Sequence, residues 1–512
     1  MRLITIRFLL LLLFSGWATG TPPWFTPRRL RRAGPAALPP TISQGFYEQT
    51  LDHFNYKPES YATFPQRYFL DSQHWGGPNS SSPFFVYFGD EAPLEEVEHY
   101  GFISKYAARF KGFSLYIEHR FFGKSIPFES REEAFRNAST LGYYNSMQAM
   151  ADYAEIILHL KEKLHAQDCP VVVFGGSYGG MLAAWFRLKY PHIATGALAS
   201  SAPVLYFDDI TPSDAYYSIV SKDFKDTSET CFTTIKKSWA EIDRVAAQRN
   251  GLSILSDKFK TCEPLTSSRE LKYELKYILI AAAQYDDPQT YPVKKICEGI
   301  DNASSNDILA QLFAGVVSYD KGTCYLNAIT NMSETEEGWE WQRCSEMLFP
   351  ISIEGGADSM FEPIQFDLRR DEQYCEFNYG VTPRPHWITT YYGGRKFKSV
   401  LREFGSNIIF SNGLRDPYSG GGVLENISDT ITAVYTREGS HCLDLVTAQT
   451  SDPAWLVEQR EKEMAIIENW IKKYTEEDDE SKGGGGETSG FSSSKLFLFV
   501  FSLSMLAHIS LL

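Results

Sequence analysis

The sequence predicts an α/β protein in which a parallel β-sheet is interrupted by a helical insertion. Short buried strands alternate with helices over residues 84–199, and this alternation stops after Pro203. A helical, cysteine-bearing stretch follows to about residue 385, and the alternation resumes at residue 407. Strands that alternate with helices indicate βαβ units and a parallel sheet. We therefore expect one sheet built from two separate segments of the chain.

The elements of the first segment follow from apolar runs and capping residues. Strands are expected over residues 84–88, 113–117, 171–174 and 197–199. One helix is expected after Asn145, which forms its cap together with Gln148, and another covers residues 181–190, where Pro191 stops it.

The clearest helix of the insertion begins with a capping box of Ser267 and Glu270, followed by apolar residues at helical spacing. The second sheet segment contributes strands over residues 407–410 and 432–435 and a closing helix over about residues 454–473. With 512 residues, the chain is longer than one hydrophobic core usually spans. The expected division is a signal peptide (1–20), a disordered leader or pro-segment (21–44), the first part of the core (45–205), a helical cap (206–390), the second part of the core (391–475) and a tail (476–512).

The composition restricts the partners. The net charge of −15 and the isoelectric point near 5.3 argue against binding to nucleic acid or anionic membranes. The aromatic content of 14% is high enough to line an apolar cleft as well as a core.

The N-terminus predicts entry into the secretory pathway. Arg2 and Arg7 precede an apolar run over residues 8–14, and the small residues Ala18 and Gly20 follow, as in a signal peptide. Five Asn-x-Ser glycosylation sequons agree with that route, at Asn79, Asn137, Asn302, Asn331 and Asn426. The destination is a lysosome or vacuole, or the extracellular space.

Six of the eight cysteines lie in the insertion, and in an oxidising lumen we expect them to form disulfides. They are Cys231, Cys262, Cys297, Cys324, Cys344 and Cys375, and their pairing cannot be read from the sequence. A metal site is the rival interpretation, but no Cys-x-x-Cys pair or histidine cluster accompanies them. Cys169 and Cys442 are candidates for free thiols, and neither a metal nor a cofactor is expected.

The C-terminus resembles a signal for a GPI lipid anchor. Acidic residues 476–480 lead into a glycine run at residues 483–486, a polar spacer and a mostly apolar tail over residues 496–512. A transmembrane helix, which needs about 20 apolar residues, and a tail without function are the alternatives.

A Gly-x-Ser-x-Gly motif, Gly175-Gly-Ser177-Tyr-Gly179, stands between a predicted strand and a predicted helix. In a nucleophile elbow the serine occupies a strained tight turn, and the glycines avoid clashes with the neighbouring strand and helix. This position makes Ser177 the candidate nucleophile and indicates an α/β-hydrolase fold.

Such a serine needs a base, and in this fold the order is Ser, then Asp or Glu, then His. His441 follows the last predicted strand, whereas His192 and His386 lie at a helix end and near the end of the insertion. Asp416 follows the preceding strand and would orient the imidazole. Asp444, the rival carboxylate, comes after His441 and does not fit the order.

The oxyanion hole is expected to use the backbone N–H of Tyr178 and one from the loop after residue 88, at Asp90. The carboxylate of Glu91 in the same loop is a candidate for receiving a substrate amine.

Longer motifs resemble the lysosomal Pro-X carboxypeptidase and dipeptidyl peptidase II family, over about residues 49–474. The motifs are Glu118-His-Arg-Phe-Phe-Gly-Lys-Ser-Ile-Pro127, Gly175 to Gly180, Ala199-Ser-Ser-Ala-Pro203, Trp339-Glu-Trp-Gln-Arg-Cys-Ser-Glu346, Met360-Phe-Glu-Pro363, Arg384-Pro-His-Trp-Ile-Thr-Thr390 and Ser411 to Gly422. The later motifs look most similar to the carboxypeptidase branch, and the thymus-specific serine protease is a more distant relative.

The resemblance implies an α/β-hydrolase with a helical, disulfide-bearing cap and exopeptidase cleavage after a penultimate proline. Proline has no N–H for strand-like docking, so a pocket must grip its ring. Candidate aromatic residues for this pocket are Trp185, Trp339, Trp341, Trp387 and Tyr418.

Two positions depart from the family. Its usual Asp-Pro-Trp reads Asp416-Pro-Tyr418 here, and its usual paired histidines read His441-Cys442. The shape of the pocket and the pH optimum are the properties that these changes affect.

The favoured function is a serine carboxypeptidase that releases the residue after a penultimate proline. A dipeptidyl peptidase that removes X-Pro pairs is the first alternative, and the two differ in the terminal charge that the cap captures. A non-catalytic cell-surface protein on a hydrolase scaffold and an esterase or lipase are further alternatives. A homodimer is compatible with the sequence.

Overall fold

The computed structural model describes residues 40–483 except 81, 97–99, 320, 321, 323 and 327–332. The predicted signal peptide, most of the leader, the apolar C-terminal tail and Asn331 lie outside the described residues, so these predictions are not addressed by the structure.

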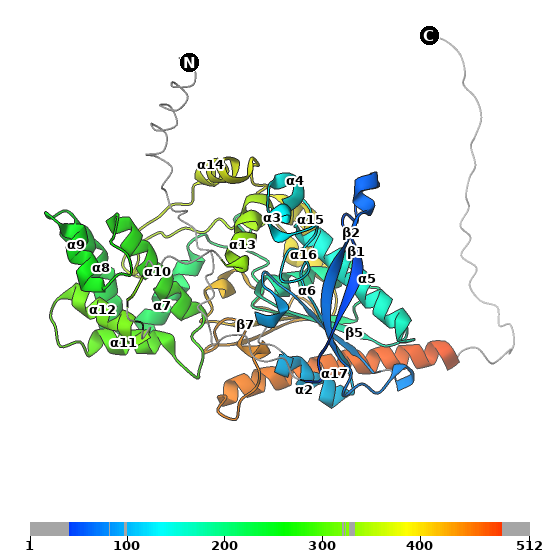
Figure 1. Cartoon of the computed structure of the whole chain (residues 1–512). Coiled ribbons are helices and arrows are strands. Elements are labelled where there is room, and N and C mark those ends of the chain that lie inside the picture. The colour runs from blue at the N-terminus through cyan, green and yellow to red at the C-terminus, as the bar shows by residue number, and fades with distance from the viewer. Residues whose placement is uncertain are drawn as a thin grey trace, which may run out of the picture.

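The described residues form one mixed sheet of eight strands, which lies beside the helical block of residues 215–319 (α7–α12) in Figure 1. Its order is β1-β2-β4-β3-β5-β6-β7-β8, and the six strands from β4 to β8 run parallel to one another. The strands are β1 (Ser43–Thr50), β2 (Thr63–Asp71), β3 (Phe84–Phe88), β4 (Phe113–Ile117), β5 (Val171–Gly176), β6 (Gly196–Ser200), β7 (Ile408–Gly413) and β8 (Ile431–Thr436). All six predicted strands are confirmed, and the parallel core is built from two segments as expected.

Strands β1 and β2 were not predicted. They pair antiparallel with each other, and β2 pairs antiparallel with β4. β1 is mostly polar and β2 contains Pro65, so neither shows the apolar run of a buried parallel strand.

The helices lie on both faces of the sheet and in the insertion. They are α2 (Tyr100–Phe110), α3 (Arg131–Ala134), α4 (Ala138–Leu141), α5 (Ser146–Lys163), α6 (Ser177–Lys189), α7 (Ala215–Thr227), α8 (Glu229–Ala246), α9 (Gly251–Phe259), α10 (Ser268–Gln284), α11 (Pro292–Asp301), α12 (Ile308–Tyr319), α13 (Glu334–Ser345), α14 (Leu368–Tyr379), α15 (Trp387–Tyr392), α16 (Phe397–Phe404) and α17 (Ala454–Gly483). Short 3-10 helices are η1 (Pro58–Tyr61), η2 (Pro78–Ser80), η3 (Leu94–Glu96), η4 (Pro417–Gly421) and η5 (Leu443–Leu445).

Both predicted N-cap side chains are present, but the predicted capping box is incomplete, because the Glu270 carboxylate accepts the Thr266 N–H instead of the Ser267 N–H. The side chain of Asn145 accepts the Gln148 N–H at the start of α5, and the Ser267 hydroxyl accepts the Glu270 N–H at the start of α10. Two boundaries differ from the prediction: α6 begins at Ser177 rather than at residue 181, and α17 continues to Gly483.

Alternation along the strands assigns each sheet face its own helices. In β3, Phe84, Val86 and Phe88 pack with residues of α5 and α6, whereas Phe85 and Tyr87 pack with residues of α2 and α17. Figure 1 accordingly shows α2 and α17 on one side of the sheet and α5 and α6 on the other. Helices therefore cover both faces of the sheet, and a functional site can form only at the ends of its strands.

Helices α7 to α12 form a second apolar core beside the sheet (Figure 1). Three disulfides are present: Cys231–Cys297 joins α8 to α11, Cys262–Cys324 joins the segments that follow α9 and α12, and Cys344–Cys375 joins α13 to α14. Cys169 and Cys442 are free and buried. The prediction of disulfides among the clustered cysteines is confirmed.

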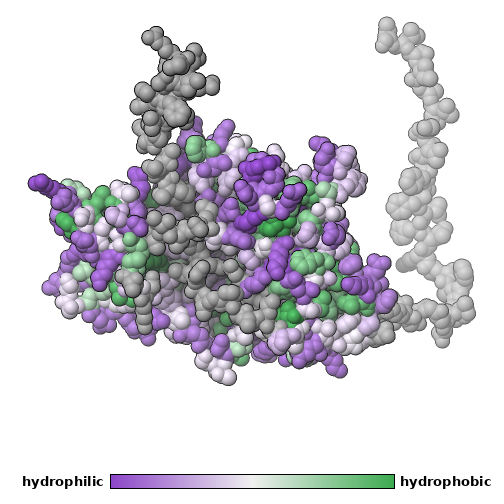
Figure 2. Space-filling model, viewed as in Figure 1, coloured by the Kyte–Doolittle hydropathy of each residue, from purple (hydrophilic) through white to green (hydrophobic). Residues whose placement is uncertain are grey.

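The face of the molecule seen in Figure 2 is mixed in polarity. On the face shown in Figure 2, hydrophilic side chains lie over the helical block and the sheet side alike, and apolar side chains are scattered between them. Among the described residues, no helix combines the length and apolarity needed to cross a bilayer.

Candidate active site

Ser177 occupies the sharp turn between β5 and α6. Its φ is +55°, in the left-handed region that non-glycine residues rarely adopt. A Cβ on Gly175 would collide with the carbonyl oxygen of Gly179, so glycine is required there. Likewise, a Cβ on Gly180 would lie 2.6 Å from the carbonyl oxygen of Ser200. The strained turn and its glycines have the geometry of a nucleophile elbow.

Asp416 and His441 come from the loops that follow the last two strands. Asp416 caps η4, where its Oδ1 accepts the Tyr418 N–H at 2.9 Å. Its Oδ2 lies 2.7 Å from His441 Nδ1, and both residues are buried, at 0% and 6% exposure. A buried carboxylate at this distance fixes the ring orientation and the tautomer of the imidazole.

The environment makes the imidazole more basic. Burial alone would lower the pKa of His441, but the charge of Asp416, the adjacent Cys442 and the hydrogen bond with Asp416 raise that pKa well above its ordinary value. The backbone N–H of His441 donates to the backbone carbonyl oxygen of Gln284 in α10, so the helical insertion helps to hold the histidine loop.

The histidine loop packs directly against the elbow. A Cβ on Gly176 would lie 3.0 Å from the sulfur of Cys442, and the Cys442 N–H donates to Ser201 Oγ at 2.9 Å. The residue before Ser177 and the residue after His441 are therefore neighbours. Among the described residues, the Ser177 hydroxyl has no hydrogen-bond partner, and in unliganded sites such bonds are often long until substrate binds.

The predicted oxyanion donors lie beside the elbow. Tyr178 is the second residue of α6, at the positive end of the helix dipole. Gly179 packs against the loop after β3, since its Cβ would lie 3.5 Å from that of Asp90. The Gly89 N–H is already bonded to the carbonyl oxygen of Ile117, so this loop can offer donors only from Asp90 onward.

An aromatic pocket begins next to these residues. It is lined by Tyr216, Tyr217, Trp339, Arg343, Met347, Leu348, Phe349, Ile351, Asp371 and Tyr418. The Tyr418 ring lies 5.5 Å from the His441 ring, and the Trp339 ring lies 6.2 Å from the Tyr178 ring. The pocket therefore lies between the sheet edge and the inserted helices.

Of the predicted pocket residues, the structure places Trp339 and Tyr418 in this lining but not the other three tryptophans. Trp185 stacks on Tyr392 at 3.9 Å in the core. The indole of Trp341 points the other way and donates to the carbonyl oxygen of Tyr144. Trp387 is half-buried and stacks on Tyr391.

Glu91 is half-buried and is not among the residues that line the pocket. Its charge nevertheless contributes to raising the pKa of the Tyr418 phenol, after burial, Tyr285 and Asp416. The Glu91 carboxylate therefore lies near Tyr418, at the end of the pocket next to His441.

Arg343 and Asp371 line the pocket but were not predicted to do so from the sequence. The signal for Arg343 was present, because it follows Trp339 by four positions and such residues share a helix face. Asp371 comes from α14, and the sequence pattern does not bring α14 beside α13, because the Cys344–Cys375 pairing is known only from the structure.

The Glu118-His119-Arg120 motif is buried and contacts Tyr178, the residue next to Ser177. Glu118 pairs with Arg67, and Arg120 Nε donates to Asp152 at 2.7 Å. His119 contacts the Tyr178 hydroxyl at 3.2 Å, and burial lowers the pKa of His119 to about 4. This histidine is therefore neutral and holds the residue next to Ser177.

In the described part of the chain, no group of three or more His, Cys, Asp or Glu side chains has the arrangement to hold a metal ion. The expectation of a mechanism without metal or cofactor stays a prediction.

The strand order and the elbow at the carboxyl edge of the parallel strands define an α/β-hydrolase. The chain belongs to the serine carboxypeptidase S28 family, whose model matches residues 49–463. It is 36% identical to the lysosomal Pro-X carboxypeptidases of Mus musculus (92% of this chain, 97% of that protein) and Homo sapiens (91% and 98%). Identity to the thymus-specific serine protease of Homo sapiens is 28%, over 86% of this chain and 88% of that protein. The family resemblance read from the motifs is confirmed.

Proposed function

We propose that this chain is a serine carboxypeptidase that releases the C-terminal residue following a penultimate proline. The observation that carries the proposal is the buried Asp416–His441 contact, whose histidine loop packs against the serine elbow and whose imidazole contacts Tyr418 in the lining of an aromatic pocket. Membership of the S28 family and the names of the 36% identical relatives support the same activity.

In this mechanism, Ser177 Oγ attacks the carbonyl carbon of proline while His441 Nε2 takes the hydroxyl proton. Asp416 stabilises the imidazolium, and the N–H groups of Tyr178 and Asp90 bind the oxyanion. Collapse of the intermediate breaks the C–N bond, and the imidazolium gives its proton to the leaving amine. Water then attacks the acyl-enzyme with His441 again acting as base, which releases the shortened peptide and restores Ser177.

The pocket suits proline for a physical reason. A proline ring has no N–H to pair with an extended strand, so recognition must come from packing around the ring. Trp339, Phe349 and Tyr418 offer aromatic faces at the end of the pocket near His441. We assign the cap to residues 206–390, and its position over the sheet edge would limit entry to chain ends.

Other assignments complete the proposal. Asn137, Asn302 and Asn426 are exposed, as glycosylation at these sequons requires, and Asn79 is kept as a fourth site. The chain would enter the secretory pathway and act in a lysosome, in a vacuole or outside the cell, with a GPI anchor at the C-terminal tail. Phosphatidylinositol-specific phospholipase C should then release it from membranes. A homodimer remains compatible with this proposal.

The test is a paired-substrate assay. Purified enzyme should cleave Z-Pro-Phe, and Ser177→Ala should abolish this cleavage. The wild-type enzyme should leave Lys-Pro-arylamide, a dipeptidyl peptidase substrate, uncut. Cleavage of the arylamide alone would favour the dipeptidyl peptidase. Cleavage of simple esters alone would favour an esterase, and no turnover of any substrate would favour a non-catalytic surface protein.

A further inference from the structure

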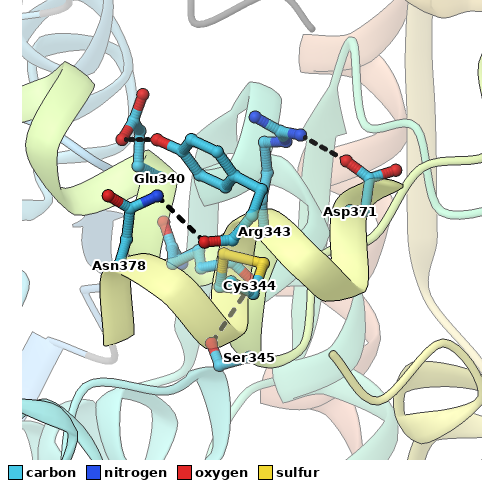
Figure 3. The surroundings of a disulfide bond; sticks show 9 residues. Glu340, Arg343, Cys344, Ser345, Asp371 and Asn378 are labelled. Atoms are coloured by element: carbon cyan, nitrogen blue, oxygen red, sulfur yellow. Dashed lines mark hydrogen bonds and ion pairs between the residues drawn. A yellow bond between two sulfur atoms is a disulfide. The ribbon is translucent and has the colours of Figure 1, made fainter. Parts of the chain in front are cut away.

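A cation and a carboxylate face each other in the wall of the aromatic pocket. Arg343 Nη2 donates to Asp371 Oδ1 at 3.0 Å, from α13 to α14 (Figure 3). Arg343 is 8% exposed and Asp371 is 2% exposed. Both residues line the aromatic pocket, and two other lining residues, Tyr418 and Trp339, contact the rings of His441 and Tyr178.

The pair leaves charged atoms without partners. Arg343 Nη1 and Asp371 Oδ2 are buried, and neither has a hydrogen-bond partner in the described structure. Buried charged groups are normally bonded at every polar atom, because an unpaired one costs free energy. The two helices are already joined next to the pair by the Cys344–Cys375 disulfide, which Figure 3 shows beneath the guanidinium group. Attachment of α14 to α13 therefore does not account for the pair.

The position of Arg343 connects it to the reacting atoms. Arg343 lies one helical turn beyond Trp339 and on the same face of α13. Trp339 packs edge-on against Tyr178, the neighbour of Ser177. Both Trp339 and Arg343 line the pocket, so the guanidinium group lies one helical turn from the residue that contacts the neighbour of Ser177.

The charges of Arg343 and Asp371 differ in the pH range over which they persist. Burial raises the pKa of Asp371 to about 6, although Arg343 and Arg370 oppose this shift and Asp367 adds to it. A guanidinium group stays protonated throughout the physiological range. Below about pH 6, where Asp371 is mostly protonated, the net charge of this wall is positive, so an anionic group suits it better than an amine.

We propose that Arg343 binds a carboxylate of the peptide substrate through Nη1, while Asp371 holds the guanidinium group in place. This inference rests on the proposed function and names the charge that the substrate must carry. Arginine and carboxylate form strong charge-assisted hydrogen bonds in a desolvated site. In a peptide ending in X-Pro-Y, the carboxylate is either the C-terminus of Y or an acidic side chain at X.

The test compares matched substrates on variants that separate binding from packing. Z-Pro-Phe against its C-terminal amide probes the terminal carboxylate, and Z-Glu-Pro-Phe against Z-Ala-Pro-Phe probes an acidic side chain. The variants are Arg343→Met, Asp371→Asn and the apolar double variant Arg343→Met/Asp371→Leu. An uncharged fluorophosphonate reports in each variant whether the Ser177 site is intact.

Wild-type enzyme should prefer the carboxylate member of one pair by about 10- to 100-fold in kcat/KM, the value of one charge-assisted hydrogen bond. Arg343→Met and the double variant should lose this preference while fluorophosphonate labelling continues, and Asp371→Asn should keep it. Which pair loses its preference identifies the source of the carboxylate.

If the double variant keeps the wild-type preference in both pairs, Arg343 has only a structural role and the inference is wrong. That failure differs from failure of the proposed function, in which the wild type would cleave none of these peptides. Should the double variant not fold, the single Arg343→Met variant and Asp371→Asn give the same comparison, because each removes only one charge.

Discussion

The Asp416→Asn substitution tests the chemistry at the centre of the site. The amide keeps the size of the side chain, and its oxygen can still accept the Tyr418 N–H that the carboxylate accepts at 2.9 Å. It loses the negative charge located 2.7 Å from His441 Nδ1. Its NH₂ group would also donate to Nδ1 and so place the imidazole proton on Nε2, where it blocks proton removal from Ser177.

The expected loss follows from the geometry. Two unit charges about 4 Å apart interact by about 4 kcal/mol at an effective dielectric constant of about 20. That energy corresponds to roughly 10³-fold in rate, and the wrong tautomer brings the loss toward the roughly 10⁴-fold seen for this change in other triads.

The assay is kcat for Z-Pro-Phe as a function of pH, with thermal unfolding measured in parallel. Asp416 raises the pKa of His441 against the effect of burial, so its removal should lower that pKa. Because the base works only when neutral, the acid limb of the pH profile should move to lower pH.

Asp444→Asn is the matched control, since Asp444 is also buried and belongs to the loop of His441, but its carboxylate accepts a hydrogen bond from the Ser200 hydroxyl instead of contacting the imidazole. The reasoning fails if folded Asp416→Asn retains more than about a tenth of wild-type kcat, or if Asp444→Asn loses as much.

Three further predictions concern the support of the site. Burial raises the pKa of Glu346 to about 7, against its hydrogen bonds from Ser146, so its stabilising contribution is complete below about pH 4.5 and is lost as the pH rises to about 7. Glu346→Gln should remove about 3 kcal/mol of pH dependence from the free energy of unfolding over that interval, measured by urea titration; an unchanged slope would contradict this. Replacing Cys344 and Cys375 with serine opens a loop of 31 residues and should lower the free energy of unfolding by about 3–4 kcal/mol while raising KM, because α14 carries Asp371; a KM equal to that of the wild type would argue against the pocket assignment. Tyr418→Ala should raise KM for Z-Pro-Phe about tenfold or more through lost aromatic packing with little change in fluorophosphonate labelling, and equal KM values would place proline elsewhere.

The sheet core was predictable from sequence because its strands are buried on both faces. Runs such as Phe84–Phe88 and Val171–Gly176 are almost wholly apolar, and a tight glycine motif follows the second of them. The antiparallel pair β1 and β2 gave no such signal, since one side of β1 faces solvent and its sequence is mixed.

The site was predictable only in part. The glycine motif selected Ser177, and Asp416 and His441 were selected by their positions after the last two predicted strands. The pocket depends on which side of each inserted helix faces the sheet, and this is decided by packing between segments far apart in the sequence. Trp339 and Trp341 are two positions apart on α13 and therefore point in different directions, one to Tyr178 and the other to Tyr144.

Covalent labelling tests the central claim most directly. After reaction of the wild-type protein with a fluorophosphonate, mass spectrometry of its peptides should find a single adduct on Ser177, and Ser177→Ala should take up no label. An adduct on another residue, or labelling of Ser177→Ala at the wild-type rate, would contradict the assignment of the elbow serine as the nucleophile.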